Sequence, residues 1–566
     1  MASFWDRYAR ARISRRRALG GTAAAGALLA AGAVVGCGGS GKGSGTPDAS
    51  GTRTAGASGY DILNAADPPR PGGTLVSANA AAFGTFDPHL GVAVASAYFP
   101  RVYNVLVNQS ATKPEFMYMD LAESFEIPDA NTFIFKIRPG VRIAPNELGV
   151  PERDLDGEDV RVTLERLKTD GATNNHAFAR DYIDTITVGD GTVTVTTPAP
   201  YAWFLNRIGL FFNTIVPREA LTGDLSKLQL KTAGAGAYRL MSVTEGESAR
   251  FERNPNYYRK DAANGGAQLP YIDALDVRTI YDRATQRTAF QSGQIHLFMT
   301  GSGAEARSLS DAVVARDPNF NYISFTMNPK RPPFDDPRVR RAISRAINRD
   351  VYADIVYGGD AQPDGMVQWS LGAYALPADE LTSKYQPFDV DEAKRMTEAV
   401  GGIKFKMMFP ADTPILEHSL HLPIFLEQMR AAGIEVEQDA QEFTTWIENY
   451  RSLNYQCSLA LNQIYETPEL PLAFHTSGGP FGDKSYIQGL GDAEIDAAVK
   501  RTSGLLDFDE RVTAVHDAQR VIYDKDPMML PLVTPYSHFA WRKNVRNIPT
   551  GIGTTGYLIN TMWMET

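Results

Sequence analysis

The chain contains little cysteine and little histidine. Its 566 residues include two cysteines, Cys37 and Cys457, and eight histidines. Two cysteines can form at most one disulfide, which excludes a disulfide-rich secreted scaffold. Eight histidines in a chain of this length are no enrichment, so the composition does not indicate a metal-binding protein.

Negative charge outnumbers positive charge after the first residues. The formal net charge is −10, and residues 1–36 hold six arginines and one aspartate. The remaining 530 residues therefore carry a formal charge of −15. An acidic body argues against nucleic acid as a partner, because phosphate binding needs a basic surface. It also disfavours direct binding to anionic lipid surfaces.

Long hydrophobic runs are missing after residue 36. The Ala/Gly-rich segment 18–36 is about 19 residues long and only modestly apolar. It barely reaches the length that a membrane-spanning helix needs, so a single membrane anchor is the weaker interpretation. The positive start, this apolar segment and the small residue before Cys37 are typical of an export signal.

Two motifs refine that signal. Ser14–Leu19 contains Arg15 and Arg16 and resembles the twin-arginine (Tat) signal, although Ala18 stands where phenylalanine is usual. Val34–Cys37 resembles the lipobox of bacterial lipoproteins, in which the cysteine is acylated and becomes the new N-terminus. We therefore expect lipidation at Cys37, which leaves Cys457 alone as a small apolar core residue.

The segment after Cys37 is rich in Gly, Ser, Thr and Ala, and predicts a flexible tether over 37–69. The body from residue 70 onward is too long for one hydrophobic core, so two or three lobes are expected. Strand-like runs alternate with helical patterns along it. The sequence predicts strands at Thr132–Ile137, Thr192–Thr196, Tyr322–Met327 and Ile403–Met408.

The clearest predicted helix begins after Asp336, an N-cap residue followed by Pro337 at the first helical position. The spacing of its apolar residues predicts one buried stripe; these residues are Val339, Ala342, Ile343, Ala346 and Ile347. Arginines occupy its other faces: Arg338, Arg340, Arg341 and Arg345. A phosphate or nucleic-acid site is the alternative interpretation of this run of arginines, and a solvated helix surface is the favoured one.

Two further helices are predicted over 391–400 and 418–432. Each is followed by glycine and then by a strand, which favours α/β lobes with ligand clefts at sheet edges.

Several blocks, in order, resemble the family 5 extracellular solute-binding proteins, the peptide- and nickel-type receptors of bacterial ABC importers. The blocks are Leu121–Phe125, Thr132–Val141, Leu155–Val160, Gly234–Tyr238, Arg253–Tyr258, Tyr271–Leu275, Ser292–Ile295, Pro333–Arg340, Ala346–Asp350, Asp391–Lys394 and Ala432–Val436. The resemblance covers nearly all of the chain after Gly72. Most of these residues suit turns, caps and tight backbone, so the blocks identify the fold and leave the cargo open.

The resemblance implies an α/β, periplasmic-binding-protein-like fold of class II, as in oligopeptide receptors. Two lobes with an interlobe cleft would be joined by two crossover strands, and lobe I would carry an extra subdomain. Transferred to this chain, the parts are a signal peptide at 1–36, the tether at 37–69, lobe I at 70–111, 230–323 and 515–566, the extra subdomain at 112–229, and lobe II at 324–514.

The resemblance also implies function: an exported, lipid-anchored receptor that delivers a solute to an ABC importer by closing its cleft. It would lie on the outer face of the cytoplasmic membrane or in the periplasm. The expected partners are a peptide or other small-molecule ligand, the importer's membrane subunits and the membrane through Cys37. We expect a monomer without cofactor, metal or nucleic acid.

Ligand residues follow only loosely from the resemblance. Oligopeptide receptors use an aspartate after a lobe II strand to bind the peptide's amino group, and Tyr465 stands at that position here. This departure argues against α-amino recognition, and an aromatic and amide lining suits a sugar or neutral solute as well as a peptide. The candidate ligand-binding residues are Val92, Val94, Trp369, Asn462, Gln463, Tyr465 and Tyr536.

Other chemistries have weaker support. His418 and His421 could share one helix face, but no third ligand stands in register with them, so no metal site is predicted. The chain has no Gly-x-Ser-x-Gly elbow, no His-Glu-x-x-His and no Walker-type loop. An exported lipoprotein hydrolase is the alternative function, and a sensor or chaperone on the same fold is a third; no catalytic residue is assigned.

Overall fold

The computed structural model describes residues 62–65, 68–91, 97–109, 117–318, 321–411, 418–463, 467–479, 489–549 and 560–565. Its largest sheet within these residues contains twelve strands, of which ten form one path in the order β19-β18-β20-β16-β21-β14-β2-β13-β10-β9. The remaining two, β15 (Ala312–Pro318) and β17 (Ala361–Pro363), both pair with β21 (Met529–Arg542).

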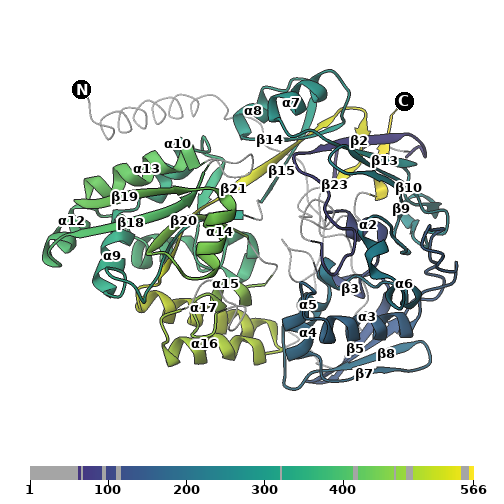
Figure 1. Ribbon diagram of the computed structural model, residues 1–566, viewed down its shortest axis with the longest axis horizontal. Coiled ribbons are helices and arrows are strands. Elements are labelled where there is room, and N and C mark those ends of the chain that lie inside the picture. Colours follow the sequence, from purple (N-terminus) through teal and green to yellow (C-terminus); the bar gives the residue numbers. More distant parts are fainter. Residues whose placement is uncertain are drawn as a thin grey trace, which may run out of the picture. The chain divides into compact units, whose positions relative to one another are not determined.

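Strand β21 belongs to both halves of this sheet (Figure 1). Its first residues pair with β16 (Asn321–Met327) and β17, and residues 536–542 pair with β15. The chain passes between the halves twice, once from β15 to β16 and once along β21. Because β15 and β16 both pair with β21, these two connections lie side by side. This is the pair of crossover strands that the sequence resemblance implies.

One half of the sheet contains the N-terminal strand and its neighbours. The strands are β2 (Thr74–Asn79), β9 (Tyr238–Thr244), β10 (Ser248–Arg253), β13 (Ala274–Thr279) and β14 (Leu297–Thr300). Here α7 (Arg283–Gln291) packs on β14, and α2 (Phe99–Val102) on β9. Gly234 and Gly236 precede β9 at a point where another part of the backbone passes very close. A Cβ on Gly234 would lie 2.1 Å from the carbonyl oxygen of Val102, and one on Gly236 would lie 2.4 Å from that of Arg101. This agrees with the tight backbone that the sequence predicts.

The other half contains the parallel strands β18 (Ile403–Pro410) and β19 (Ile434–Gln441) beside β20 (Cys457–Gln463). Its helices are α9 (Pro337–Ala346), α10 (Arg349–Ile355), α12 (Val390–Ala399), α13 (His418–Ala431) and α14 (Phe443–Arg451). Helix α13 packs on β19 and α14 on β18 (Figure 1). Cys457 is buried in β20, as predicted.

Helix α9 agrees with its predicted cap and stripe. The Asp336 side chain accepts a hydrogen bond from the amide of Arg338, and all five apolar residues of the stripe are buried. The prediction that its arginines form a solvated face is wrong for Arg340, which is 5% exposed. Its guanidinium donates to the carbonyl oxygens of Asp526, Phe334 and Lys525, which offset the loss of water.

A four-stranded antiparallel sheet lies within the segment 112–229. Its order is β5 (Ala122–Asp129), β6 (Thr132–Ile137), β8 (Thr192–Thr196) and β7 (Ile186–Val188). Helix α3 (Gly157–Thr169) packs on β7 and β8, and α4 (His176–Tyr182) packs on α3. The segment is completed by α5 (Phe204–Ile208) and α6 (Arg218–Leu221).

One hydrophobic core contains residues of this segment and of 366–523 together. The second group comes from residues 366–381 and from α15 (Glu469–Ala473), α16 (Ala493–Gly504) and α17 (Phe508–Asp524). Helix α17 continues unbroken through the expected lobe boundary at 514/515, and β16 through that at 323/324. The division into lobes remains a prediction.

Among the described residues, no helix combines the length and apolar character that crossing a bilayer requires. The expected signal, with Arg15 and Arg16, and the expected lipidation at Cys37 lie outside the described residues.

Candidate functional site

Trp369 and Tyr536, which the sequence analysis selected separately, are in contact. Their ring centroids lie 5.0 Å apart at an angle of 44°, and both side chains are partly exposed. Tyr536 stands in β21 opposite Pro318 of β15, where β21 passes from one half of the sheet to the other. Trp369 begins the short helix η5 (Trp369–Tyr374) that follows β17.

The buried carboxyl group of Asp364 positions Trp369 through hydrogen bonds. Asp364 follows β17 and accepts hydrogen bonds from the amides of Gly365 and Trp369, each at 2.9 Å, and from the Thr534 hydroxyl of β21. Burial raises the pKa of Asp364 to about 7. The carboxyl group thus ties the loop that carries Trp369 to the strand that carries Tyr536.

The indole nitrogen of Trp369 is a buried donor without a hydrogen-bond acceptor in the described part of the chain. Buried polar groups nearly always have a partner in native proteins. The site therefore combines a partly exposed aromatic pair with a buried indole donor that no described acceptor satisfies.

Two further side chains cover Tyr536. The Arg316 guanidinium of β15 lies 3.3 Å from the centre of the Tyr536 ring, and the Gln362 amide donates to the Tyr536 hydroxyl at 2.6 Å. Asp360 is an ion-pair partner of Arg316 (3.4 Å) and of Arg307 (3.1 Å). This crossing, where β15 and β17 pair with β21, therefore gathers two aromatic rings, an amide and an ion-paired guanidinium, which are the kinds of group that bind planar and polar parts of small organic molecules.

Sequence reasoning missed Arg316, Gln362 and Asp360. They lie within about 50 residues of one another but some 170 to 220 residues before Tyr536, and no motif joins them to it. Only the pairing of β15 and β17 with β21 brings them together.

The backbones of Asn462 and Gln463 lie near the same crossing. They end β20 opposite Tyr322 and Asn321, the first residues of β16 after the β15–β16 connection. Their side chains, and all of Tyr465, Val92 and Val94, are outside the described residues. The ligand roles of these five residues therefore remain predictions.

The segment that leads toward Val92 is fixed at its start. The Arg166 guanidinium of α3 donates to both carboxylate oxygens of Asp87, at 3.1 and 2.7 Å, and contacts Nδ1 of His89 at 3.1 Å. Burial and the charge of Arg166 lower the pKa of His89 to about 4. His89 is therefore neutral at pH 7, as its close contact with a guanidinium requires.

No cluster of three or more His, Cys, Asp or Glu suited to a metal ion occurs among the described residues. His421 instead lies 3.1 Å from the Tyr357 hydroxyl through Nε2, and the side chain of His418 is outside the described residues.

A second group of contacts joins the segment 112–229 to η5 and to α15–α17. The Tyr201 hydroxyl lies 2.8 and 2.7 Å from the two carboxylate oxygens of Glu469, and burial raises the pKa of Glu469. Trp203 packs edge-on against Tyr374 with ring centroids 5.4 Å apart. The Arg511 guanidinium lies 5.1 Å from the centre of the Trp203 ring.

Comparison with known proteins finds relatives of this chain among peptide- and glutathione-binding proteins. Di/tripeptide-binding protein 2 of Pseudomonas aeruginosa is 23% identical over 473 residues, covering 75% of this chain and 82% of that protein. The glutathione-binding protein GsiB of Pectobacterium atrosepticum is 26% identical over 281 residues; the match spans 48% of this chain and only half of that protein's length.

Solved structures share the fold. The periplasmic binding protein DppA from Helicobacter pylori, in complex with the peptide STSA, has a TM-score of 0.71 at 22% identity and covers 88% of this chain and 99% of that one. AgaA from A. tumefaciens R10, in complex with agropinic acid, has a TM-score of 0.69 at 20% identity, with 87% and 99% covered. These likenesses confirm the predicted fold, that of class II periplasmic binding proteins of the peptide-binding type.

A match between this chain and the sequence model of a protein family identifies the family. The model of the bacterial extracellular solute-binding proteins, family 5 (middle region), matches residues 117–483, which is more than half of the chain. The chain belongs to the family 5 bacterial extracellular solute-binding proteins.

Proposed function

We propose that this protein is the receptor of an ABC importer and binds a peptide-like or other small organic solute at the crossing of β15, β17 and β21. The observation that carries the proposal is the contact between Trp369 and Tyr536, with an unsatisfied indole donor beside it. The relatives support the substrate class, because their names describe peptide and glutathione binding.

Binding would proceed without a covalent step. The rings of Trp369 and Tyr536 would pack against the solute, the indole N–H would donate to an acceptor on it, and Arg316 would attract a carboxylate or other polar group. Residues from both halves of the sheet then contact one solute, so binding would favour the arrangement in which they lie close together. The importer's membrane subunits would recognise that arrangement and receive the solute intact.

A ligand panel tests the receptor proposal against the alternative of a hydrolase. Thermal unfolding of the body from residue 66 is measured with di- and tripeptides, glutathione, opines and oligosaccharides. A ligand at a hundredfold excess over its Kd stabilises the native state by about 2.7 kcal/mol. The proposal predicts a rise in melting temperature with one class and recovery of that compound unchanged. Consumption of the compound would contradict the receptor assignment.

We also propose that the receptor is exported and held at the membrane through a lipid on Cys37. Cys37→Ala is expected to move the protein from the membrane fraction to the soluble exported fraction, whereas Cys457→Ala serves as the matched cysteine control and should not. A Cys37→Ala protein that stays in the membrane fraction would contradict the anchor.

Export by the twin-arginine route is a separate part of the proposal. Replacement of Arg15 and Arg16 by lysine keeps the charge and is expected to stop export, while the same change at Arg7 and Arg10 should be tolerated. Continued export and lipidation of the Arg15/Arg16 variant would contradict this route.

A further inference from the structure

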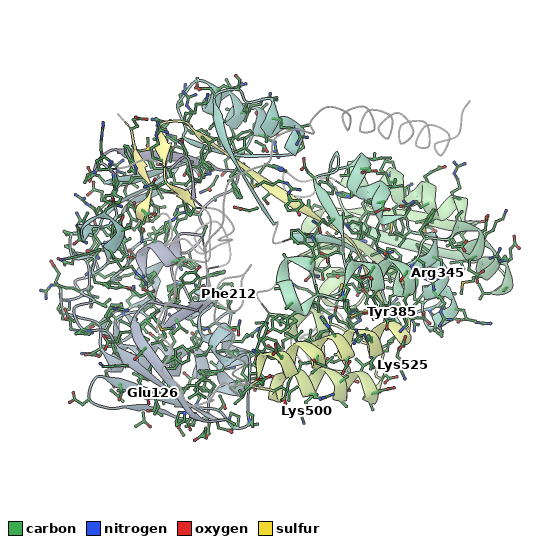
Figure 2. All side chains as sticks on the ribbon, turned by 180° about the vertical axis from the view of Figure 1, so that it is seen from behind. Glu126, Phe212, Arg345, Tyr385, Lys500 and Lys525 are labelled. Carbon is green, nitrogen blue, oxygen red and sulfur yellow. The ribbon has the colours of Figure 1, made fainter. Side chains whose placement is uncertain are left out.

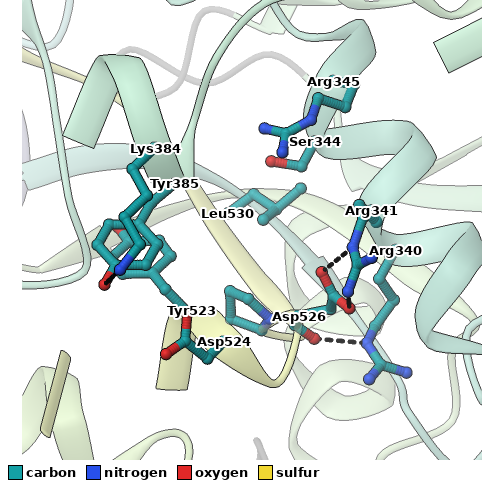
Figure 3. A pocket seen from close by; sticks show the side chains of 11 residues that line it. Arg340, Arg341, Ser344, Arg345, Lys384, Tyr385, Tyr523, Asp524, Asp526 and Leu530 are labelled. Atoms are coloured by element: carbon teal, nitrogen blue, oxygen red, sulfur yellow. Dashed lines mark hydrogen bonds and ion pairs between the residues drawn. The ribbon is translucent and has the colours of Figure 1, made fainter. Parts of the chain in front are cut away.

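A cationic cavity of about 190 Å³ lies away from the β21 crossing, between α9, the turn η6 (Leu381–Tyr385) and the end of α17. Four cationic side chains line it, against the carboxylates of Asp524 and Asp526; the cations are Arg340, Arg341, Arg345 and Lys384. Figure 3 shows Lys384 and Tyr385 across the cavity from Arg345 and Ser344, with Leu530 between them. Figure 2 labels Arg345 and Tyr385 on neighbouring elements.

The carboxylates do not neutralise all of these cations. Asp526 forms a two-point ion pair with Arg341, at 2.8 and 2.6 Å, and so is already occupied. Among the described residues, the acceptors for Arg340 are backbone carbonyl oxygens. In the described part of the chain, Arg345 forms no ion pair with a carboxylate, and the Lys384 ammonium donates to the Tyr385 hydroxyl at 2.7 Å.

A fifth cation stands next to the cavity. Arg349 of α10 is 5% exposed and donates from Nε to the Pro531 carbonyl, while its two terminal nitrogens have no hydrogen-bond partner among the described residues. Burial, with the nearby charge of Arg345 acting in the same direction, lowers the pKa of Arg349 to about 10. Unpaired buried guanidinium nitrogens are costly unless an anion lies near.

We propose that this cavity binds a small phosphate-bearing anion. Guanidinium and ammonium groups with a hydroxyl nearby are the usual set of phosphate ligands, and Arg345, Lys384 and Ser344 provide one of each. The volume is below the 300–1,000 Å³ typical of pockets for drug-sized ligands, so the anion is small. The site is separate from the solute site and does not depend on the proposed transport function.

Isothermal titration with inorganic phosphate and with glycerol phosphate tests this site. Titration with sodium chloride at equal ionic strength is the control for non-specific salt effects. The wild-type protein is expected to bind at least one of the two probes. The probe that binds more tightly shows whether the site prefers free phosphate or a phosphate ester. Arg345→Gln and Lys384→Gln are each expected to weaken binding at least tenfold.

Arg338→Gln is the matched control, because this arginine lies on the same helix, is exposed and does not line the cavity. Its affinity is expected to equal that of the wild type. Thermal unfolding without phosphate shows whether each variant is folded. Failure of both probes to bind the wild type, or equal binding by the folded Arg345→Gln and Lys384→Gln variants, would overturn the proposal.

Discussion

At the scale of single residues, Asp364 is a buried carboxyl group that holds the loop of Trp369 against β21. Its pKa is about 7 in the folded protein, because burial disfavours the charged form, and near 3.8 in the unfolded chain. Between these values the folded state holds a proton that the unfolded state has lost. The free energy of unfolding therefore falls as pH rises through this window.

Asp364→Asn removes this titration and keeps an oxygen to accept from the amides of Gly365 and Trp369. We expect the stability of the wild type relative to this variant to fall between pH 4 and pH 8, by about 4 kcal/mol for a shift of three pKa units. Urea unfolding at several pH values measures the difference. Exposed Asp190→Asn is the control, and a pH-independent difference for Asp364→Asn would contradict the account.

Gly236 is a second residue whose role depends on its immediate neighbours. An added Cβ would lie 2.4 Å from the Arg101 carbonyl oxygen and 2.6 Å from the carbonyl carbon of Val102. Because both are backbone atoms, Gly236→Ala is expected to reduce the free energy of unfolding by about 2 kcal/mol or more. Gly171→Ala, where a Cβ meets nothing within 4 Å, should cost far less. Equal unfolding midpoints in urea would show that the contact is not rigid.

At the scale of elements, local chemistry made several helices and strands predictable. Strands β6 and β8 have the predicted bounds, and α9 begins where Asp336 and Pro337 indicated. These signals lie within a few residues of the element they define. The burial of Arg340 could not be predicted, because the carbonyl groups of Lys525 and Asp526 that accept from it are some 185 residues away.

The cap of α9 gives a prediction at this scale. Asp336→Ala removes the acceptor for the Arg338 amide and is expected to lower the free energy of unfolding by about 1 kcal/mol. Asp335→Ala, at the exposed neighbouring residue, should change it by less than half as much. Chemical unfolding of the two variants makes the comparison, and an equal loss in both would contradict the capping role.

At the scale of the whole molecule, the segment 112–229, residues 366–381 and the helices α15–α17 contribute to one hydrophobic core. The contact of Tyr201 with Glu469 lies within it, and nothing in the local sequence of either residue indicates the other. The candidate solute site has the same property. Trp369 and Tyr536 were predictable as aromatic candidates, but their contact and the position of Arg316 beside Tyr536 depend on the long-range pairing of β21.

Tyr201→Phe tests the first of these long-range contacts. The change leaves the buried Glu469 carboxyl without the hydroxyl that bonds to it, so we expect a loss of about 1–3 kcal/mol in the free energy of unfolding. Tyr182→Phe is the control, because this ring stacks on Tyr201 at 3.9 Å and is only partly buried. Equal stability of the two variants would show that Tyr201 does not hold the two parts together through its hydroxyl.

The central claim is that a solute binds at the Trp369–Tyr536 contact. The most direct measurement is isothermal titration of the solute found in the ligand panel into the wild type, Tyr536→Ala and Tyr281→Ala, the last being an exposed tyrosine outside the candidate site. The account predicts at least a tenfold loss of affinity for Tyr536→Ala and wild-type affinity for Tyr281→Ala. Unchanged affinity in a folded Tyr536→Ala protein would contradict it.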